Sequence, residues 1–116
     1  MKNVLIIGGN SDIGFSLGQQ FTKFGYNLIL ASKNLSNLEH KKKLIETNFK
    51  YKCDVYKFDV ENDDILSLFD KIDRDIDTII FSNGYFERPE INSYKIININ
   101  YLSIVKICED LVSNNK

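Results

Sequence analysis

The chain has 116 residues, of which 43% are hydrophobic and 27% charged, and its formal net charge is -1. This length and apolar content suffice for one domain with a buried core and argue against a disordered chain. The near-neutral charge argues against a dedicated nucleic-acid binder, because it provides no broad basic surface.

Membrane insertion and secretion are not indicated by the sequence. No stretch approaches the roughly 18 consecutive apolar residues of a membrane helix. The first residues, Met1 to Val4, have neither the apolar core nor the cleavage site of a signal peptide. Cys53 and Cys108 are widely separated, which predicts neither a disulfide framework nor a metal site. We therefore expect a cytoplasmic protein without a bound metal.

The first strand and helix are predicted from a change in hydrophobic periodicity. Residues 3–8 are almost continuously apolar, as in a strand buried on both faces of a parallel sheet. A helix is expected from Asp12 to Phe24, and Gly25 is suited to end it. Helical spacing predicts that its buried face carries Ile13, Leu17, Phe21 and Phe24.

The same alternation continues to the end of the chain. Further strands are predicted at residues 27–31, 52–58 and 78–82. The second helix has a capping-box spacing at Ser36 and Glu39, with Leu38, Leu44 and Ile45 on its apolar side. A short third helix carries Ile65, Leu68, Phe69 and Ile72. A long fourth helix, residues 92–112, carries a stripe of Ile97, Tyr101, Ile104, Cys108 and Leu111.

Four strands alternating with four helices predict an α/β fold with a doubly wound parallel sheet. Right-handed crossovers favour the strand order 3-2-1-4, with helices flanking the sheet. No repeat or linker interrupts the pattern, so residues 1–116 are predicted to form a single domain.

A glycine loop, Gly8-Gly9-Asn10-Ser11-Asp12-Ile13-Gly14, joins the first strand to the first helix. Gly8 suits a tight turn, Gly9 a close approach of backbone to phosphate, and Gly14 close packing of the helix on the sheet. Backbone N–H groups and the positive end of the helix would then face an anion. The loop therefore predicts a site for a dinucleotide pyrophosphate, although a tight turn without a ligand is the alternative.

The end of the second strand indicates which dinucleotide is preferred. An acidic residue there would bind the free 2′-hydroxyl of NAD, but this chain has Ser32 and Lys33. A hydroxyl followed by a cation suits a 2′-phosphate, which favours NADP(H), with NAD(H) still open. The alternative is that Lys33 is an ordinary solvated lysine.

Four motifs in chain order resemble those of the short-chain dehydrogenase/reductase family. They are the glycine loop, Phe58-Asp59-Val60 after the third strand, Ser82-Asn83-Gly84 after the fourth, and Asn100-Tyr101-Leu102-Ser103 in the last helix. The resemblance covers nearly the whole chain and implies a Rossmann-like, NAD(P)-binding domain. Asp12 departs from the family's middle loop glycine, and Asn83 from its Asn-Ala-Gly turn.

The resemblance implies a role for each matching residue. Gly8, Asn10, Ser11, Asp12, Ile13 and Gly14 would surround the pyrophosphate and adenosine; Asp59 and Val60 would lie at the adenine; Ser82, Asn83 and Gly84 would lie near the nicotinamide ribose. Asn100 would support the proton relay of the active site. Local alternatives remain: Asp59 would equally cap the following helix, and Asn83-Gly84 is a common turn pair.

The family's catalytic tyrosine, with a lysine four residues later, has no counterpart in this sequence. None of the six tyrosines is followed by lysine at that spacing. The sequence thus resembles the cofactor-binding half of the fold, and we expect a truncated or split reductase that is inactive alone. Two alternatives are a non-catalytic NADP(H)-binding module and a protein-interaction module.

The expected partners follow from this interpretation. They are the dinucleotide and, if the fold is completed, a small carbonyl or alcohol substrate. The edge of the fourth strand and the last helix would meet another copy or a complementing chain.

Overall fold

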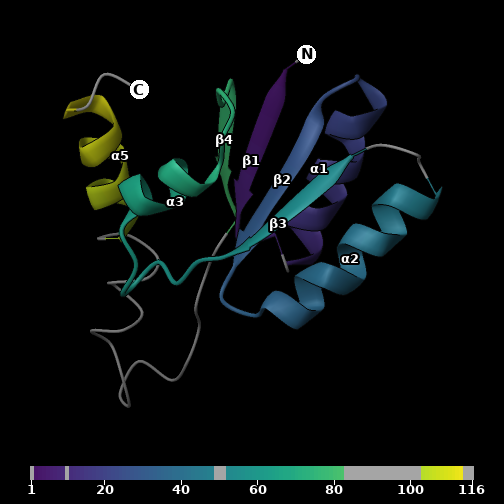
Figure 1. The fold of residues 1–116 in the computed structure, drawn as a ribbon, viewed down its shortest axis with the longest axis horizontal. Helices are drawn as coiled ribbons and strands as arrows, with labels where there is room; N and C mark the ends of the chain where they lie inside the picture. Colours follow the sequence, from purple (N-terminus) through teal and green to yellow (C-terminus); the bar gives the residue numbers. More distant parts are fainter. Residues whose placement is uncertain (1, 10, 49–51, 83–102, 114–116) are drawn as a thin grey trace. The chain divides into compact units, whose positions relative to one another are not determined.

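The computed structural model describes residues 2–9, 11–48, 52–82 and 103–113. The chain divides into two compact units, residues 1–58 with 74–83 and residues 59–73 with 84–116. The first contains β1 (Asn3–Ile7), α1 (Asp12–Lys23), β2 (Asn27–Ser32), α2 (Leu35–Asn48), β3 (Cys53–Lys57) and β4 (Thr78–Phe81). The second contains α3 (Ile65–Lys71) and α5 (Ser103–Ser113) (Figure 1).

The four strands form one sheet in the order β3-β2-β1-β4, and every pairing is parallel. Ile7 pairs with Ala31 on one side and with Phe81 on the other, while Ser32 pairs with Lys57. Because the strands are parallel, their carboxyl ends all lie at one edge of the sheet. The predicted fold class and strand order are confirmed.

One face of this sheet is covered by both α1 and α2. Buried side chains of β1, β2 and β3 on this face form a cluster with two residues of α2: Val4, Ile6, Leu28, Leu30, Cys53, Leu38 and Ile45. Phe15 and Phe21 of α1 pack against the same cluster. Phe21 also meets Tyr26 edge-on, with ring centroids 4.9 Å apart. The apolar strands thus form a core against which both helices pack.

The buried face of α1 differs from the predicted one. Ile13 is 72% exposed and Phe24 is 80% exposed, whereas Gly14, Gly18 and Thr22 are buried. A Cβ on Gly18 would lie 3.0 Å from Leu28 Cδ2, so the helix approaches the sheet through its small residues. Of the predicted side chains, Phe21 does pack against the core, whereas Ile13 and Phe24 do not. Gly25, with a φ of +86°, follows the helix as expected.

The start of α2 is capped by a different residue from the predicted one. The Asn34 side-chain oxygen accepts hydrogen bonds from Asn37 N, at 3.2 Å, and from Ser36 Oγ, at 2.9 Å. The predicted capping box of Ser36 and Glu39 is therefore wrong, because the Ser36 hydroxyl donates to the cap instead of accepting from the backbone. The helix consequently begins at Leu35, two residues before the start that a cap at Ser36 would give.

Replacing the cap should therefore destabilise the protein more than replacing Ser36. We expect Asn34→Ala to lower the free energy of unfolding by about 1 kcal/mol, the usual cost of losing an N-cap side chain. Ser36→Ala should cost less, since it removes no acceptor of a backbone N–H group. Urea unfolding of both variants measures the difference, and a larger loss in Ser36→Ala would restore the capping-box interpretation.

The second unit pairs α3 with α5. Asp64 caps α3 by accepting a hydrogen bond from Leu66 N at 3.2 Å. The buried side chains of the second unit are Ile65, Leu68, Ile72, Ile107 and Leu111. Cys108 is exposed, which corrects its predicted place on the inner stripe, and Ile107 is buried in its stead. Ile97 and Tyr101 lie outside the described residues.

Candidate cofactor-binding site

The glycine loop is fastened to the carboxyl end of β2 by its backbone. Gly8 N and Gly9 N both donate to Ala31 O, at 2.8 and 3.2 Å, and Ser11 N donates to Gly8 O at 3.0 Å. Gly8 has a φ of +90°, a conformation that residues with a Cβ rarely adopt. The predicted tight turn at Gly8 is confirmed, and the hydrogen bonds fix the loop where α1 begins.

The other two loop glycines are required by close contacts. A Cβ on Gly9 would lie 2.9 Å from Leu30 Cβ, so this glycine packs on β2. A Cβ on Gly14 would lie 2.8 Å from Gly8 O and 2.9 Å from the hydroxyl oxygens of both Ser11 and Ser82. Gly14 thus lies close to the residues that follow β1 and β4, and Gly18, which was not predicted, makes a second close approach of α1 to the sheet.

Ser11 connects the loop to the end of β4. Its hydroxyl oxygen caps α1 by accepting from Gly14 N at 2.9 Å, and it lies 2.6 Å from Ser82 Oγ. Ser82 N in turn donates to Ile7 O at 2.7 Å. Ser11, predicted near the pyrophosphate, and Ser82, predicted near the nicotinamide ribose, are thus in direct contact at the carboxyl edge of the sheet.

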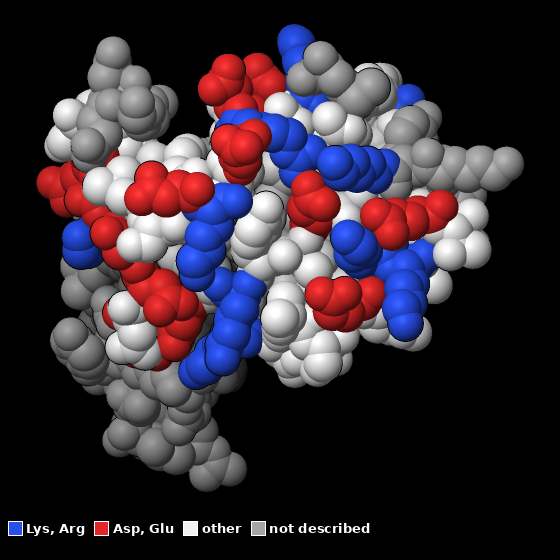
Figure 2. All heavy atoms as spheres, in the orientation of Figure 1, with Lys and Arg blue, Asp and Glu red and all other residues white. Residues whose placement is uncertain are grey.

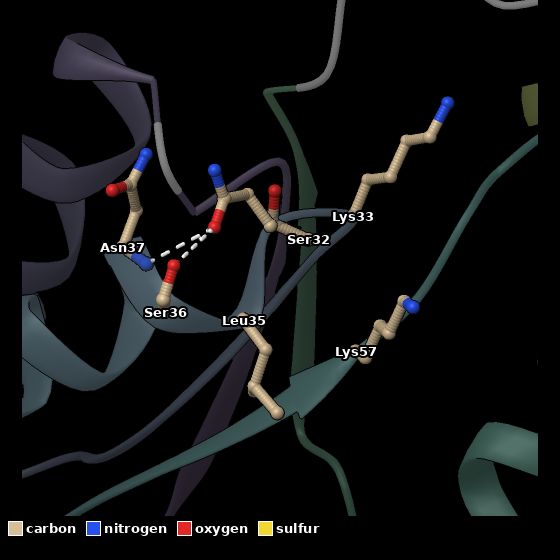
Figure 3. A pocket seen from close by; sticks show the side chains of 7 residues that line it. Ser32, Lys33, Leu35, Ser36, Asn37 and Lys57 are labelled. Atoms are coloured by element: carbon tan, nitrogen blue, oxygen red, sulfur yellow. Dashed lines mark hydrogen bonds between the residues drawn. The ribbon is translucent and has the colours of Figure 1, made fainter.

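An open hollow lies beside the end of β2. Its described lining consists of Ser32, Lys33, Asn34, Leu35, Ser36, Asn37 and Lys57. Ser32 is held in place by Phe58 N, which donates to Ser32 O at 2.8 Å. The predicted pair Ser32 and Lys33 therefore lines one recess with the first turn of α2 (Figure 3). Lys57 also lines this recess and was not predicted.

The positive charge of this hollow is local. On the face drawn in Figure 2, Lys and Arg side chains are interspersed with Asp and Glu, as the near-neutral composition suggested. Among the described residues that line the hollow, two are lysines and none is acidic. The partial positive charge at the start of α2 has the same sign. The recess is therefore suited to an anion.

Asp59 organises a turn in the second unit. Its carboxylate accepts from Glu61 N at 3.0 Å and from Asn62 Nδ2 at 2.9 Å, and Asp59 N donates to Asp63 Oδ2 at 2.8 Å. Asp64, not Asp59, caps the following helix. The alternative interpretation of Asp59 as the cap of α3 is therefore wrong. Val60, in the same turn, is half-buried.

The remaining predicted site residues are placed as follows. Asp12 and Ile13 form the first turn of α1, where both are exposed. Asn10, Asn83, Gly84 and Asn100 lie outside the described residues. Among the described residues, no group of His, Cys, Asp and Glu is arranged to hold a metal ion. No described helix is long and apolar enough to cross a membrane.

Comparison with known proteins identifies the family. The model of the short chain dehydrogenase family matches residues 2–114, so the chain belongs to this family. The 17-beta-hydroxysteroid dehydrogenase type 3 of Danio rerio is 28% identical to this chain. The matched region covers 92% of this chain and 39% of that protein. A very-long-chain 3-oxoacyl-CoA reductase of Vanderwaltozyma polyspora is 44% identical over 62 residues. This shorter match covers 53% of this chain and 18% of that protein. The chain thus spans less than half of these curated relatives.

Solved structures of the family have the same fold. The alcohol dehydrogenase of the archaeon Thermococcus sibiricus, complexed with 5-hydroxy-NADP, superimposes with a TM-score of 0.82 at 20% identity. A short chain dehydrogenase of Escherichia coli CFT073, complexed with NADPH, gives 0.81 at 13% identity. Each comparison covers 97% of this chain and 52% of the other. The fold is therefore Rossmann-like.

Proposed function

We propose that this chain is the NADP(H)-binding half of an oxidoreductase that transfers a hydride between nicotinamide and a carbonyl or alcohol substrate. The observation that carries the proposal is the glycine loop, fixed by Ala31 O and joined to the end of β4 through Ser11 and Ser82. A Cβ on Gly14 would collide with three oxygens there, so the loop keeps its form only with glycine at this position. This supports a pyrophosphate site made of backbone N–H groups.

The other proposed contacts are assigned by residue. The loop residues Gly8, Asn10, Ser11, Asp12, Ile13 and Gly14 hold the pyrophosphate; Asp59 and Val60 meet the adenine; Ser82, Asn83 and Gly84 meet the nicotinamide ribose. Ser32 and Lys33 bind the 2′-phosphate, and Asn100 supports the active site. The hydride chemistry belongs to the bound nicotinamide, and the residues of this chain bind and orient it.

Binding without turnover is expected from these 116 residues. No tyrosine in the sequence is followed four residues later by lysine. A tyrosine of ordinary pKa, about 10, needs such a neighbour to exchange protons near neutral pH. We propose that the β4 edge and α5 meet a second copy or a complementing chain, in the cytoplasm, and that a carbonyl or alcohol substrate binds to the completed enzyme.

Equilibrium titration tests the cofactor proposal. NADPH and NADH are added separately to the purified chain, and nicotinamide fluorescence is followed. We expect saturable binding of both nucleotides, with the lower dissociation constant for NADPH. A folded chain that binds neither would refute the cofactor site and favour an interaction module, and equal affinities would refute the NADP preference.

Removing the positive charge of Lys33 should weaken only the phosphorylated cofactor. We expect Lys33→Gln to raise the dissociation constant for NADPH about tenfold, because a charge-assisted hydrogen bond to a partly exposed phosphate is lost. The constant for NADH should stay within about twofold. Lys2→Gln is the matched control, because Lys2 is exposed and precedes β1, at the opposite edge of the sheet. Equal losses for both cofactors would show that Lys33 does not contact the 2′-phosphate.

A further inference from the structure

Lys57 lies at the end of β3 and faces the same hollow as Ser32 and Lys33. It is the register partner of Ser32 across the parallel β2–β3 pair, and both line the recess. Phe58 N, the next backbone donor, binds Ser32 O at 2.8 Å. The ends of the two strands are therefore fastened together, which fixes the distance between the backbones that carry Ser32, Lys33 and Lys57.

Strand alternation places the Lys57 side chain on the face occupied by α2. Cys53 and Val55 of β3 belong to the cluster beneath α1 and α2, and Lys57 follows at the same two-residue spacing. Phe58, on the opposite side of the chain, is 2% exposed. Ser32 follows Leu28 and Leu30 on this same face of β2. The recess is therefore bounded by two strand ends and by the first turn of α2.

The geometry of the recess supplies two cations from different elements. In Figure 3, Lys33 extends from the segment after β2 and Lys57 from the end of β3, both away from Ser36 and Asn37. The described lining adds the hydroxyls of Ser32 and Ser36 and contains no carboxylate. A group with two negative charges and several acceptor oxygens matches this lining better than a hydroxyl does.

We propose that Lys57 is a second specificity-determining cation, which binds the 2′-phosphate of NADP(H) jointly with Lys33. The inference rests on the proposed cofactor function and adds a residue from β3 to a site otherwise formed by the segment after β2. Each lysine alone is an exposed, flexible cation of modest strength. Two lysines anchored on adjacent strands bring two positive charges to one phosphate, and this distinguishes NADP(H) from NAD(H).

The test compares Lys57→Gln, Lys33→Gln and the double variant with the wild-type chain. Dissociation constants are measured for NADPH and NADH by nicotinamide fluorescence, and for 2′,5′-ADP and 5′-AMP by competition against NADPH. We expect Lys57→Gln to weaken NADPH and 2′,5′-ADP about fivefold, and NADH and 5′-AMP less than about twofold. The double variant should bind NADPH no more tightly than NADH.

Controls separate this inference from the cofactor proposal itself. Lys57→Arg should restore most of the NADPH affinity, and Lys2→Gln should leave it unchanged. If the wild-type chain prefers NADPH but Lys57→Gln leaves that preference intact, the role of Lys57 is refuted and the cofactor proposal stands. If the wild-type chain binds neither nucleotide, both are refuted. Equal weakening of NADPH and NADH in Lys57→Gln would also contradict a 2′-phosphate contact.

Discussion

Gly14→Ala is expected to abolish saturable NADPH binding and to lower the free energy of unfolding by about 2–3 kcal/mol, the upper range for overpacking. The new methyl group would lie within 2.9 Å of Gly8 O, Ser11 Oγ and Ser82 Oγ. Gly8 O belongs to the backbone of the loop and cannot rotate away. Ser11 would have to abandon its contact with Ser82, its cap on α1, or both. Cofactor titration and urea unfolding measure the two effects.

Gly18→Ala is the matched control in the same helix. Its Cβ would meet Leu28 Cδ2 and Cδ1, at 3.0 and 3.1 Å, which are the far ends of a flexible side chain. Alanine also has a helix propensity about 1 kcal/mol better than that of glycine. We therefore expect a small change in stability and unchanged NADPH binding. If Gly14→Ala binds NADPH as well as Gly18→Ala does, the loop does not form the cofactor site.

Alkaline pH is expected to destabilise the protein through Cys53. Burial is the largest cause that raises the pKa of this thiol from 9.0 to about 12. The nearby carboxylates of Glu46 and Asp54 act in the same direction, and the ammonium group of Lys42 opposes them. Because the pKa is higher in the folded state, the stabilisation is complete below pH 9 and is lost as the pH rises towards 12. The free energy of unfolding should fall by at most about 1.4 kcal/mol for each pH unit in this range.

Urea unfolding at several pH values, under reducing conditions, checks this expectation. Tyrosines and lysines also titrate above pH 9, so the informative quantity is the difference between the wild type and Cys53→Ala. That variant should lose less stability per pH unit, although it is less stable at neutral pH. Cys108→Ser should behave like the wild type, because Cys108 is exposed. An equal pH dependence in the wild type and Cys53→Ala would contradict the burial argument.

Strands β1 and β2 were predictable because strands buried on both faces are nearly continuous apolar runs, and the strand order follows from right-handed crossovers. The buried face of α1 was only partly predictable: Phe21 does pack against the core, but Ile13-Leu17-Phe21 and Gly14-Gly18-Thr22 have the same helical spacing. Only the close approach of Leu28 to Gly18 selects the small residues. The cap of α2 was missed for a related reason: Asn34, Ser36 and Glu39 all suit the start of a helix, and three-dimensional contacts choose among them.

The parts of the candidate site that depend on local sequence were predictable. The parts that depend on how neighbouring strands pair were not. The loop glycines and the Ser32-Lys33 pair were found from motif position alone. The contact between Ser11 and Ser82 joins residues 71 positions apart, and it requires β1 to pair with β4. Aligning the carboxyl ends of the second and third predicted strands, at residues 31 and 58, would have placed Lys57 beside Leu30; only the observed register pairs Lys57 with Ser32.

The location of NADPH binding tests the central claim most directly. Two-dimensional amide NMR spectra of the isotopically labelled chain are recorded during titration with NADPH. The account predicts the largest shift changes at Gly8, Gly9 and Ser11–Gly14, in residues 32–37, at Lys57, Asp59 and Val60, and at Ser82. Changes confined to other segments, such as the apolar hollow of Gln20, Phe21, Phe24 and Tyr26, would contradict it. So would an unchanged spectrum at a saturating concentration of NADPH.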